Sequence, residues 1–440
     1  MFIADIDNPF RTFLSSCGKS DLIDLQNVPA SSKDCALGMC DFLSEMWIHH
    51  NKIPKLSSRP VLFIISVDGI ASEFIFKVWE QHRLQDAAKS LIPEYITTCD
   101  KPIVLFDNSA EGHCDEYIFK FISEVVKTFK LDPTKTFYCN SAENISDIHN
   151  NSSYKNDFKV FFSNNYKEDT MSELLKEVQT VNIKEDMDKT FLFSCLNNAP
   201  RPHRALFLGG LVHRGLHTDG MISSPSVEFD RLFADTVIYL GNMHKQGKIS
   251  KTDLLQGMQY LQSLEDHYPM VLDNRTLDEV HMKSISQEQD FLQKLKSCEI
   301  DVITESFVDY TVYVTEKVYK PIIMKQPFMI LGPGRTLDVL RKNGYDTFDH
   351  LYTNPGIFDK KSNVMEKINF LLSDLETLQM KKDSPVMWED IQCKNNEIAE
   401  KNYANFIKKR ENINSMLVKD LASWLSIYPG FSNVFNCYNR

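Results

Sequence analysis

The segment from Tyr313 to Tyr319 places a hydroxyl, a carboxylate and an ammonium at consecutive positions between an expected strand and an expected helix. Thr315 is suited to cap the helix, because a threonine side chain accepts a hydrogen bond from a free N–H group of the first turn. The other free N–H groups and the positive end of the helix dipole favour a bound diphosphate. Glu316 can accept the hydroxyls of a ribose, and Lys317 can neutralise a phosphate. The alternative is ordinary capping chemistry at a helix start.

Around these residues the chain resembles the α1,3-fucosyltransferase family and its bacterial and viral relatives, including phage-type glycosyltransferases. These proteins carry Tyr-x-Thr-Glu-Lys at the start of a helix, followed by a strand that ends in Leu-Gly or Val-Gly, as Leu331-Gly332 does here. The resemblance covers residues 307–341. It implies a GT-B-like α/β fold, two Rossmann-like domains with a cleft between them, and a nucleoside diphosphate sugar contacted by Glu316 and Lys317. Tyr313 and Thr315 of the same segment are further candidates for donor binding. Pro321 and Lys325-Gln326 depart from the family pattern, so the donor sugar stays open.

A second polar segment runs from Asn197 to Arg204, after the first expected strand of the C-terminal half. Pro202 suits the first turn of the following helix, where its missing N–H costs nothing. Arg201 and Arg204 then lie at the helix entrance, where a guanidinium can hold a diphosphate through two parallel hydrogen bonds. The resemblance also implies a phosphate-binding arginine here, and the sequence does not choose between the two. Asn197 or Asn198 can contact the sugar or the base, and the alternative role of the arginine pair is a surface salt bridge.

An acidic loop from Asp107 to His113 ends an expected strand in the N-terminal half. Sugar transfer with inversion needs a base that takes the proton of the acceptor hydroxyl. Asp107, Glu111 and His113 are candidates. Because the resemblance implies a glutamate base in this domain, we expect Glu111 to be the base and keep His113 as a second catalytic candidate. Gly112 would let the backbone approach a ligand closely; the alternative is a helix-entry loop with solvated acids.

Short apolar runs alternate with amphipathic helices along the chain, which is typical of a mostly parallel α/β sheet. We expect strands at 61–67, 103–106, 136–139, 159–162, 190–195, 221–223, 300–304 and 328–331. Helices are expected at 33–49, 71–84, 116–129, 203–214, 286–296, 316–324 and 335–343, with a helical middle over 226–264. A charged stretch at 184–189 separates the halves. The sequence therefore predicts an N-terminal acceptor-side domain over 1–185, a donor domain over 186–395 and a helical tail over 396–440.

The composition limits the kinds of protein that this chain can be. Its 440 residues exceed one ordinary core, and its net charge of −11 argues against a protein coated with positive charge. The longest aliphatic run, 60–67, is less than half of the roughly 20 residues that a membrane helix needs. Ten cysteines without a Cys-x-x-Cys pair suit reduced thiols. We expect a cytoplasmic protein without a membrane span, located in the host cytoplasm if the chain is viral.

Metal and acceptor are the remaining questions that the sequence raises. Asp186 and Asp188 lie in the charged linker and are expected to be solvated, and His213 and His217 lack a third ligand, so we expect neither a metal nor a cofactor beyond the donor. A glycan is the favoured acceptor. The alternative is hydroxymethylcytosine in phage DNA, which would be flipped out of the duplex; the basic run at 408–410 is the best candidate for contact with a polyanion. A non-catalytic protein that binds a nucleotide sugar or a glycan is the alternative outside enzymes.

Overall fold

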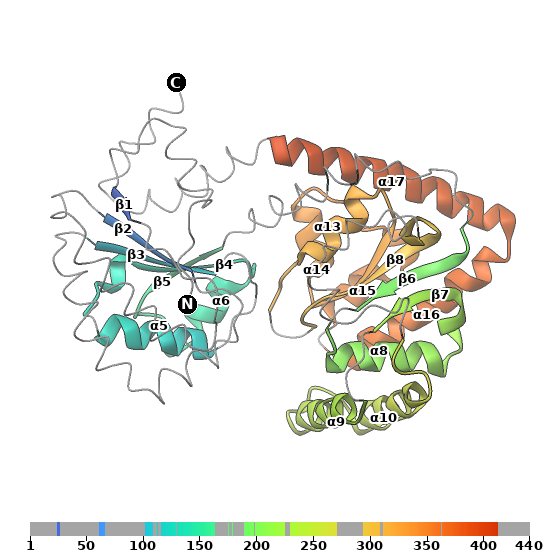
Figure 1. The fold of residues 1–440 in the computed structure, drawn as a ribbon, viewed down its shortest axis with the longest axis horizontal. Helices are drawn as coiled ribbons and strands as arrows, with labels where there is room; N and C mark the ends of the chain where they lie inside the picture. The colour runs from blue at the N-terminus through green and yellow to red at the C-terminus, as the bar shows by residue number, and fades with distance from the viewer. Residues whose placement is uncertain are drawn as a thin grey trace. The chain divides into compact units, whose positions relative to one another are not determined.

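The computed structural model describes residues 24–26, 61–66, 102–108, 112, 116–128, 130–162, 175, 178, 189–197, 199–224, 229–270, 294–308, 311–361 and 363–411. The chain divides into two compact units, residues 1–166 with 412–440 and residues 167–411. Each unit contains its own parallel sheet (Figure 1). The α/β class is therefore confirmed, whereas the domain limits expected at residues 185 and 395 stay predictions.

Five parallel strands in sequence order form the sheet of the N-terminal unit. They are β1 (Asp24–Gln26), β2 (Val61–Ser66), β3 (Pro102–Asn108), β4 (Thr136–Asn140) and β5 (Lys159–Phe162), with the helices α5 (Glu116–Thr128) and α6 (Ile145–Asn150) and a 3₁₀ turn (Pro133–Lys135). Ile118, Ile122 and Val125 are buried, as their helical spacing predicts. Phe119 of α5 packs edge-on against Tyr138 of β4. The helices expected at 33–49 and 71–84 lie outside the described residues.

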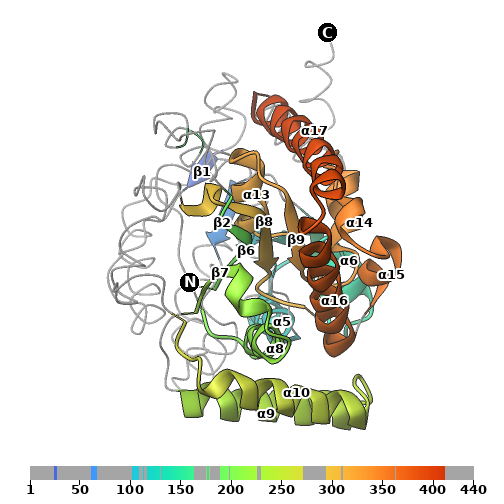
Figure 2. The ribbon, with the colours of Figure 1, turned by 90° about the vertical axis from the view of Figure 1, so that its right-hand side faces the viewer.

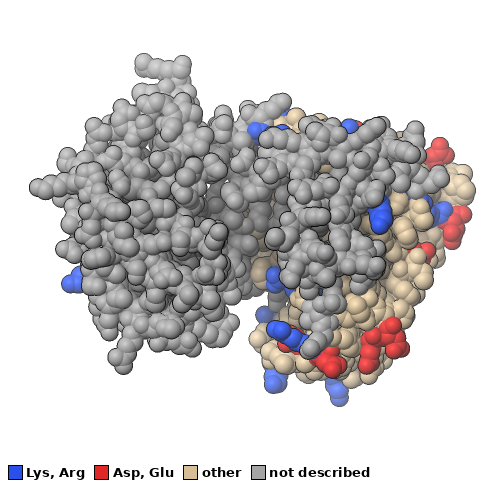
Figure 3. All heavy atoms as spheres, viewed as in Figure 1, with Lys and Arg blue, Asp and Glu red and all other residues tan. Residues whose placement is uncertain are grey.

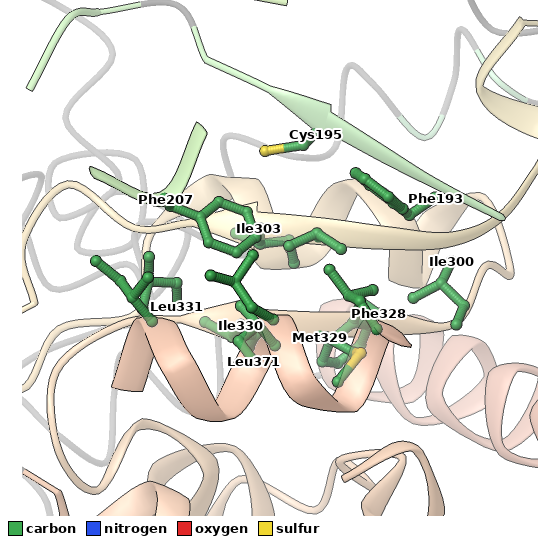
Figure 4. Close-up of a cluster of buried hydrophobic side chains, with 14 of the residues drawn as sticks. Phe193, Cys195, Phe207, Ile300, Ile303, Phe328, Met329, Ile330, Leu331 and Leu371 are labelled. Carbon is green, nitrogen blue, oxygen red and sulfur yellow. The ribbon is translucent and has the colours of Figure 1, made fainter. Parts of the chain in front are cut away.

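The C-terminal unit has a four-stranded parallel sheet in the order β7-β6-β8-β9. Its strands are β6 (Phe191–Leu196), β7 (Gly220–Ser223), β8 (Cys298–Thr304) and β9 (Phe328–Leu331). Figure 4 shows how side chains of β6, β8 and β9 meet Phe207 and Leu371 of the covering helices. All four residues of β9 are buried, because a parallel strand covered on both faces has no solvent side.

Helices cover both faces of this sheet and extend beyond it (Figures 1 and 2). They are α8 (Pro202–His213), α9 (Phe229–Lys245), α10 (Lys251–Glu265), α13 (Glu316–Ile323), α14 (Thr336–Lys342), α15 (Pro355–Lys360), α16 (Val364–Lys382) and α17 (Pro385–Glu411), with 3₁₀ turns at Leu216–Asp219 and Asp349–Leu351. The pair α9 and α10 lies outside α8 (Figure 2). A Cβ added to Gly209 of α8 would lie 2.2 Å from the carbonyl oxygen of Tyr260 of α10, so only glycine permits this close approach.

The structure corrects the expected helical middle at 226–264. It breaks over residues 246–250, where Gly247 adopts a φ of +69° and Ser250 begins α10 with a capping box to Asp253. The sequence analysis did not expect α15 or α16, although α16 buries nine residues. α17 continues without interruption through residues 395 and 396 and packs against α13 and α16. No helix among the described residues is long and apolar enough to cross a membrane.

Candidate anion site at the carboxyl ends of β6 and β8

Two loops of the C-terminal unit meet where the sheet reverses its winding direction. β7 lies on one side of β6, whereas β8 and β9 lie on the other side. In an open parallel sheet such a reversal leaves a crevice outside the carboxyl ends of the two central strands, and ligands bind there. The loop after β6 and the loop after β8 carry the two segments that the sequence predicts for the donor.

Hydrogen bonds of Asn197 tie the ends of these two strands together. Its Oδ1 accepts from Thr304 Oγ1 at 2.5 Å, and its Nδ2 donates to Cys195 Sγ at 3.4 Å. Asn197 is buried, and the hydrogen bonds of its side-chain amide stabilise the carboxyl ends of β6 and β8. The neighbouring Asn198 lies outside the described residues.

Arg204 and His203, in the first turn of α8, are buried and bonded to the backbone at the end of β8. Arg204 donates to the carbonyl oxygens of Ala199 at 2.8 Å, Thr304 at 3.0 Å and Glu305 at 3.4 Å. His203 Nε2 lies 2.9 Å from the carbonyl oxygen of Glu305, which can only accept, so Nε2 carries the proton. Arg204 thus braces the β6–α8 loop against β8.

Burial lowers the pKa of His203 to about 3, and repulsion from Arg204, Arg201 and Lys317 adds to the shift. The imidazole is therefore neutral at physiological pH. All three cations therefore disfavour the protonated form of this ring.

Arg201 occupies the N-cap position of α8 and is less buried than Arg204. Its guanidinium carbon lies 5.2 Å from the centre of the Phe307 ring, which belongs to the loop after β8. As expected, Pro202 opens the helix. The N–H groups of Arg204 and Ala205 already bond to the carbonyl of Arg201, so Arg201 stands directly at the helix entrance.

The start of α13 follows the loop after β8. Thr315 is its N-cap, and its Oγ1 accepts from the N–H of Lys317 at 3.3 Å, which confirms the expected cap. The ammonium of Lys317 lies 3.3 Å from both Ser306 Oγ and Thr315 Oγ1. Tyr313 is buried. Glu316 is the first residue of α13, and its side chain lies outside the described residues.

Glu305 joins the two helix starts. It is fully buried, and its Oε1 accepts from the N–H of Thr315 at 3.0 Å. Its carbonyl oxygen accepts from His203 and Arg204 of α8. Within the described part of the chain Oε2 has no hydrogen-bond partner. One residue thus fixes α8 and α13 relative to each other.

The start of the next helix along the sheet, α14, cannot bind an anion in the same way. Asp359 accepts from the N–H groups of Leu337 and Asp338 at its start, at 2.9 and 3.1 Å, so an internal carboxylate occupies that helix end. The glycine turn at 332–334 leads into α14, and Lys367 donates to the carbonyl oxygen of Gly332 at 2.7 Å. Positive helix ends combined with cationic side chains are thus found at α8 and α13.

The expected catalytic residues of the N-terminal unit are not part of this description. Glu111 and His113 lie outside the described residues. Asp107 is a residue of β3, and its side chain is not among those described. Gly112 is buried. The assignment of Glu111 as the base therefore stays a prediction.

No group of three or more His, Cys, Asp or Glu residues poised for a metal ion occurs among the described residues. His213 instead pairs with Ser263 Oγ at 3.0 Å, and His217 packs against His267. Asp186 and Asp188 lie outside the described part of the chain.

Comparison with known proteins adds no family assignment. No family model, no curated protein and no solved structure matches the chain.

The sequence analysis missed four residues of this site, namely Thr304, Glu305, Ser306 and Phe307. Their position in the sequence could have identified them, because Thr304 ends the expected strand at 300–304 and the other three follow it directly. Ligands bind at this end of parallel strands. Long-range contacts to Arg201, Arg204 and Lys317 give these four residues their importance, and no local pattern encodes such contacts.

Proposed function

We propose that this chain is a GT-B-type glycosyltransferase whose C-terminal unit binds the diphosphate of a nucleotide-sugar donor. The observation that carries the proposal is that Arg201, Arg204 and Lys317, at the starts of α8 and α13, all contact the loop after β8, where the sheet reverses direction. A diphosphate is the common ligand that combines several negative charges with oxygens for helix N–H groups.

The three cations have different roles in this proposal. Arg201 and Lys317 contact the phosphates, because they stand at the two helix entrances and are less buried than Arg204. Arg204 donates to three carbonyl oxygens and positions the loop that carries Arg201. Its charge still favours a bound anion at short range. Glu316 is proposed to contact the ribose.

In the proposed reaction the acceptor oxygen attacks the anomeric carbon and forms a new C–O bond. The bond between that carbon and the phosphate oxygen breaks, and the nucleoside diphosphate leaves with the electron pair. The acceptor proton passes to Glu111, the proposed base. Arg201, Lys317 and the helix ends stabilise the negative charge that grows on the leaving diphosphate, so the arrangement supplies this stabilisation without a metal.

A glycan is the favoured acceptor. Among the described residues of the C-terminal unit, Figure 3 shows basic and acidic side chains on the same face. The net charge of −11 also gives no general attraction for a polyanion such as DNA. Hydroxymethylcytosine in DNA remains the alternative. It predicts a log affinity that falls with log salt by roughly 0.9 per phosphate contact, which a neutral glycan does not show.

A panel of nucleotide sugars tests the donor proposal, with thermal stabilisation and slow release of nucleoside diphosphate as readouts. Lys317→Ala should weaken binding of the active nucleotide by about 2–4 kcal/mol, because the ammonium pairs with a partly desolvated phosphate. Lys325→Ala is the matched control, since Lys325 follows the far end of α13 and pairs with Glu400.

Three outcomes separate the proposal from its rivals. Binding with sugar release supports the enzyme. Binding without release or transfer to any glycan or hydroxymethylated DNA supports a non-catalytic nucleotide-sugar protein. No stabilisation by any member of the panel contradicts a donor site.

A further inference from the structure

Three consecutive residues of the loop after β8 each contact one cation of the anion site. The carbonyl oxygen of Glu305 accepts from Arg204, the hydroxyl of Ser306 accepts from Lys317, and the ring of Phe307 lies beneath Arg201. The three contacting groups are neutral, namely a carbonyl, a hydroxyl and an aromatic face. Such contacts orient a cation while leaving its charge intact for an anion.

The contact between Phe307 and Arg201 differs from the other two in an important way. Arg204 is fixed by three carbonyl oxygens and Lys317 by two hydroxyls. At Arg201, which stands at the N-cap position of α8, the contact is instead made by an aromatic ring, 5.2 Å from the guanidinium carbon. The face of an aromatic ring attracts a guanidinium electrostatically and favours a parallel arrangement, so the ring limits the directions that Arg201 can take.

We propose that Phe307 is a positioning residue of the diphosphate site, which holds the Arg201 guanidinium at the entrance of α8 in readiness for the phosphate. The inference rests on the proposed diphosphate site. Without the ring, the long arginine side chain would pay more rotamer entropy when it binds the anion. Phe307 thus affects diphosphate affinity without contacting the phosphate.

The test compares aromatic with aliphatic side chains at position 307 in the full-length protein. Phe307→Leu and Phe307→Met keep an apolar side chain of similar size, whereas Phe307→Trp and Phe307→Tyr keep an aromatic face. Calorimetry with GDP, UDP and inorganic pyrophosphate measures the affinity, and circular dichroism checks folding. We expect Leu and Met to weaken binding by about 3- to 10-fold and Trp and Tyr to stay within about twofold of the unmodified protein.

A double-mutant cycle with Arg201→Ala identifies the partner of the ring. If Phe307 acts through Arg201, Phe307→Leu causes no further loss in the Arg201→Ala protein. A full additional loss in that background, or aromatic variants that bind as weakly as Leu and Met, would overturn the inference and leave the proposed function standing. Absence of binding of all three probes to the unmodified protein would overturn the proposed diphosphate site, and the inference with it.

Discussion

Arg201 and Arg204 are three positions apart, yet the structure predicts opposite consequences of replacing them. Arg204→Met keeps the apolar stem of the side chain but removes the donors to the carbonyl oxygens of the buried Thr304 and of Ala199, which is partly exposed. The carbonyl of Glu305 keeps His203 as a partner. Arg201→Met is the matched control, because it removes the same charge from the N-cap of the same helix.

The expected loss of stability follows from the two hydrogen bonds. A buried acceptor left without its donor costs about 1–3 kcal/mol and a partly exposed one costs less, so Arg204→Met should lower the free energy of unfolding by about 2–4 kcal/mol. For a unit of this size that corresponds to about 5–15 °C in melting temperature. Arg201→Met should change the melting temperature by less than about 2 °C, because partly exposed positions contribute little, and should instead weaken diphosphate binding.

Thermal and urea unfolding measure the difference. Circular dichroism follows both units, and the fluorescence of the buried Trp388 of α17 reports on the C-terminal unit once Trp47, Trp79 and Trp424 are replaced by phenylalanine. Equal destabilisation by the two substitutions would refute the division of roles between the arginines. Unchanged stability of Arg204→Met would show that its backbone bonds do not brace the loop.

Three further predictions concern protons and metal. Burial lowers the pKa of His203 to about 3 in the folded protein. Between about pH 3 and pH 6.5 the unfolded chain therefore binds more protons than the folded protein does. The free energy of unfolding should therefore fall by up to about 1.4 kcal/mol per pH unit as the pH drops below 6.5. Urea unfolding between pH 7 and pH 5 should show a shallower fall for His203→Gln. Equal pH dependence of the variant and the unmodified protein would contradict this. Burial raises the pKa of Asp301 to about 6, so its charged form is costly above that pH. Asp301→Asn should melt at a higher temperature at pH 8 and lose this advantage below about pH 4, and no gain at pH 8 would argue against a costly buried charge. Sugar transfer should survive EDTA, whereas loss on chelation with recovery on adding manganese or magnesium would point back to Asp186 and Asp188.

Much of the fold follows from local features of the sequence. Short apolar runs predicted β4, β6 and β9 to within one residue at each end, because a strand covered on both faces is mostly apolar. β5 was also predicted within these limits, although its residues are exposed or only partly buried. Thr315 and Pro202 marked the starts of α13 and α8, since caps and first-turn prolines act within a few residues of the chain. The break between α9 and α10 was missed, because the sequence analysis gave no weight to Gly247 and Ser250 within an otherwise helical pattern.

The sequence by itself predicted two α/β halves and the polar segments at the starts of α8 and α13, but only the tertiary structure decided which side chains meet. Nothing near Arg204 in the sequence shows that it bonds to Thr304 and Glu305, about one hundred residues away. The order of the strands makes this contact, because β6 and β8 become neighbours although β7, α9 and α10 lie between them in the chain. Capping and strand formation depend on neighbours in sequence, whereas the roles of Arg201, Arg204 and Phe307 depend on strands that pair across that long connection.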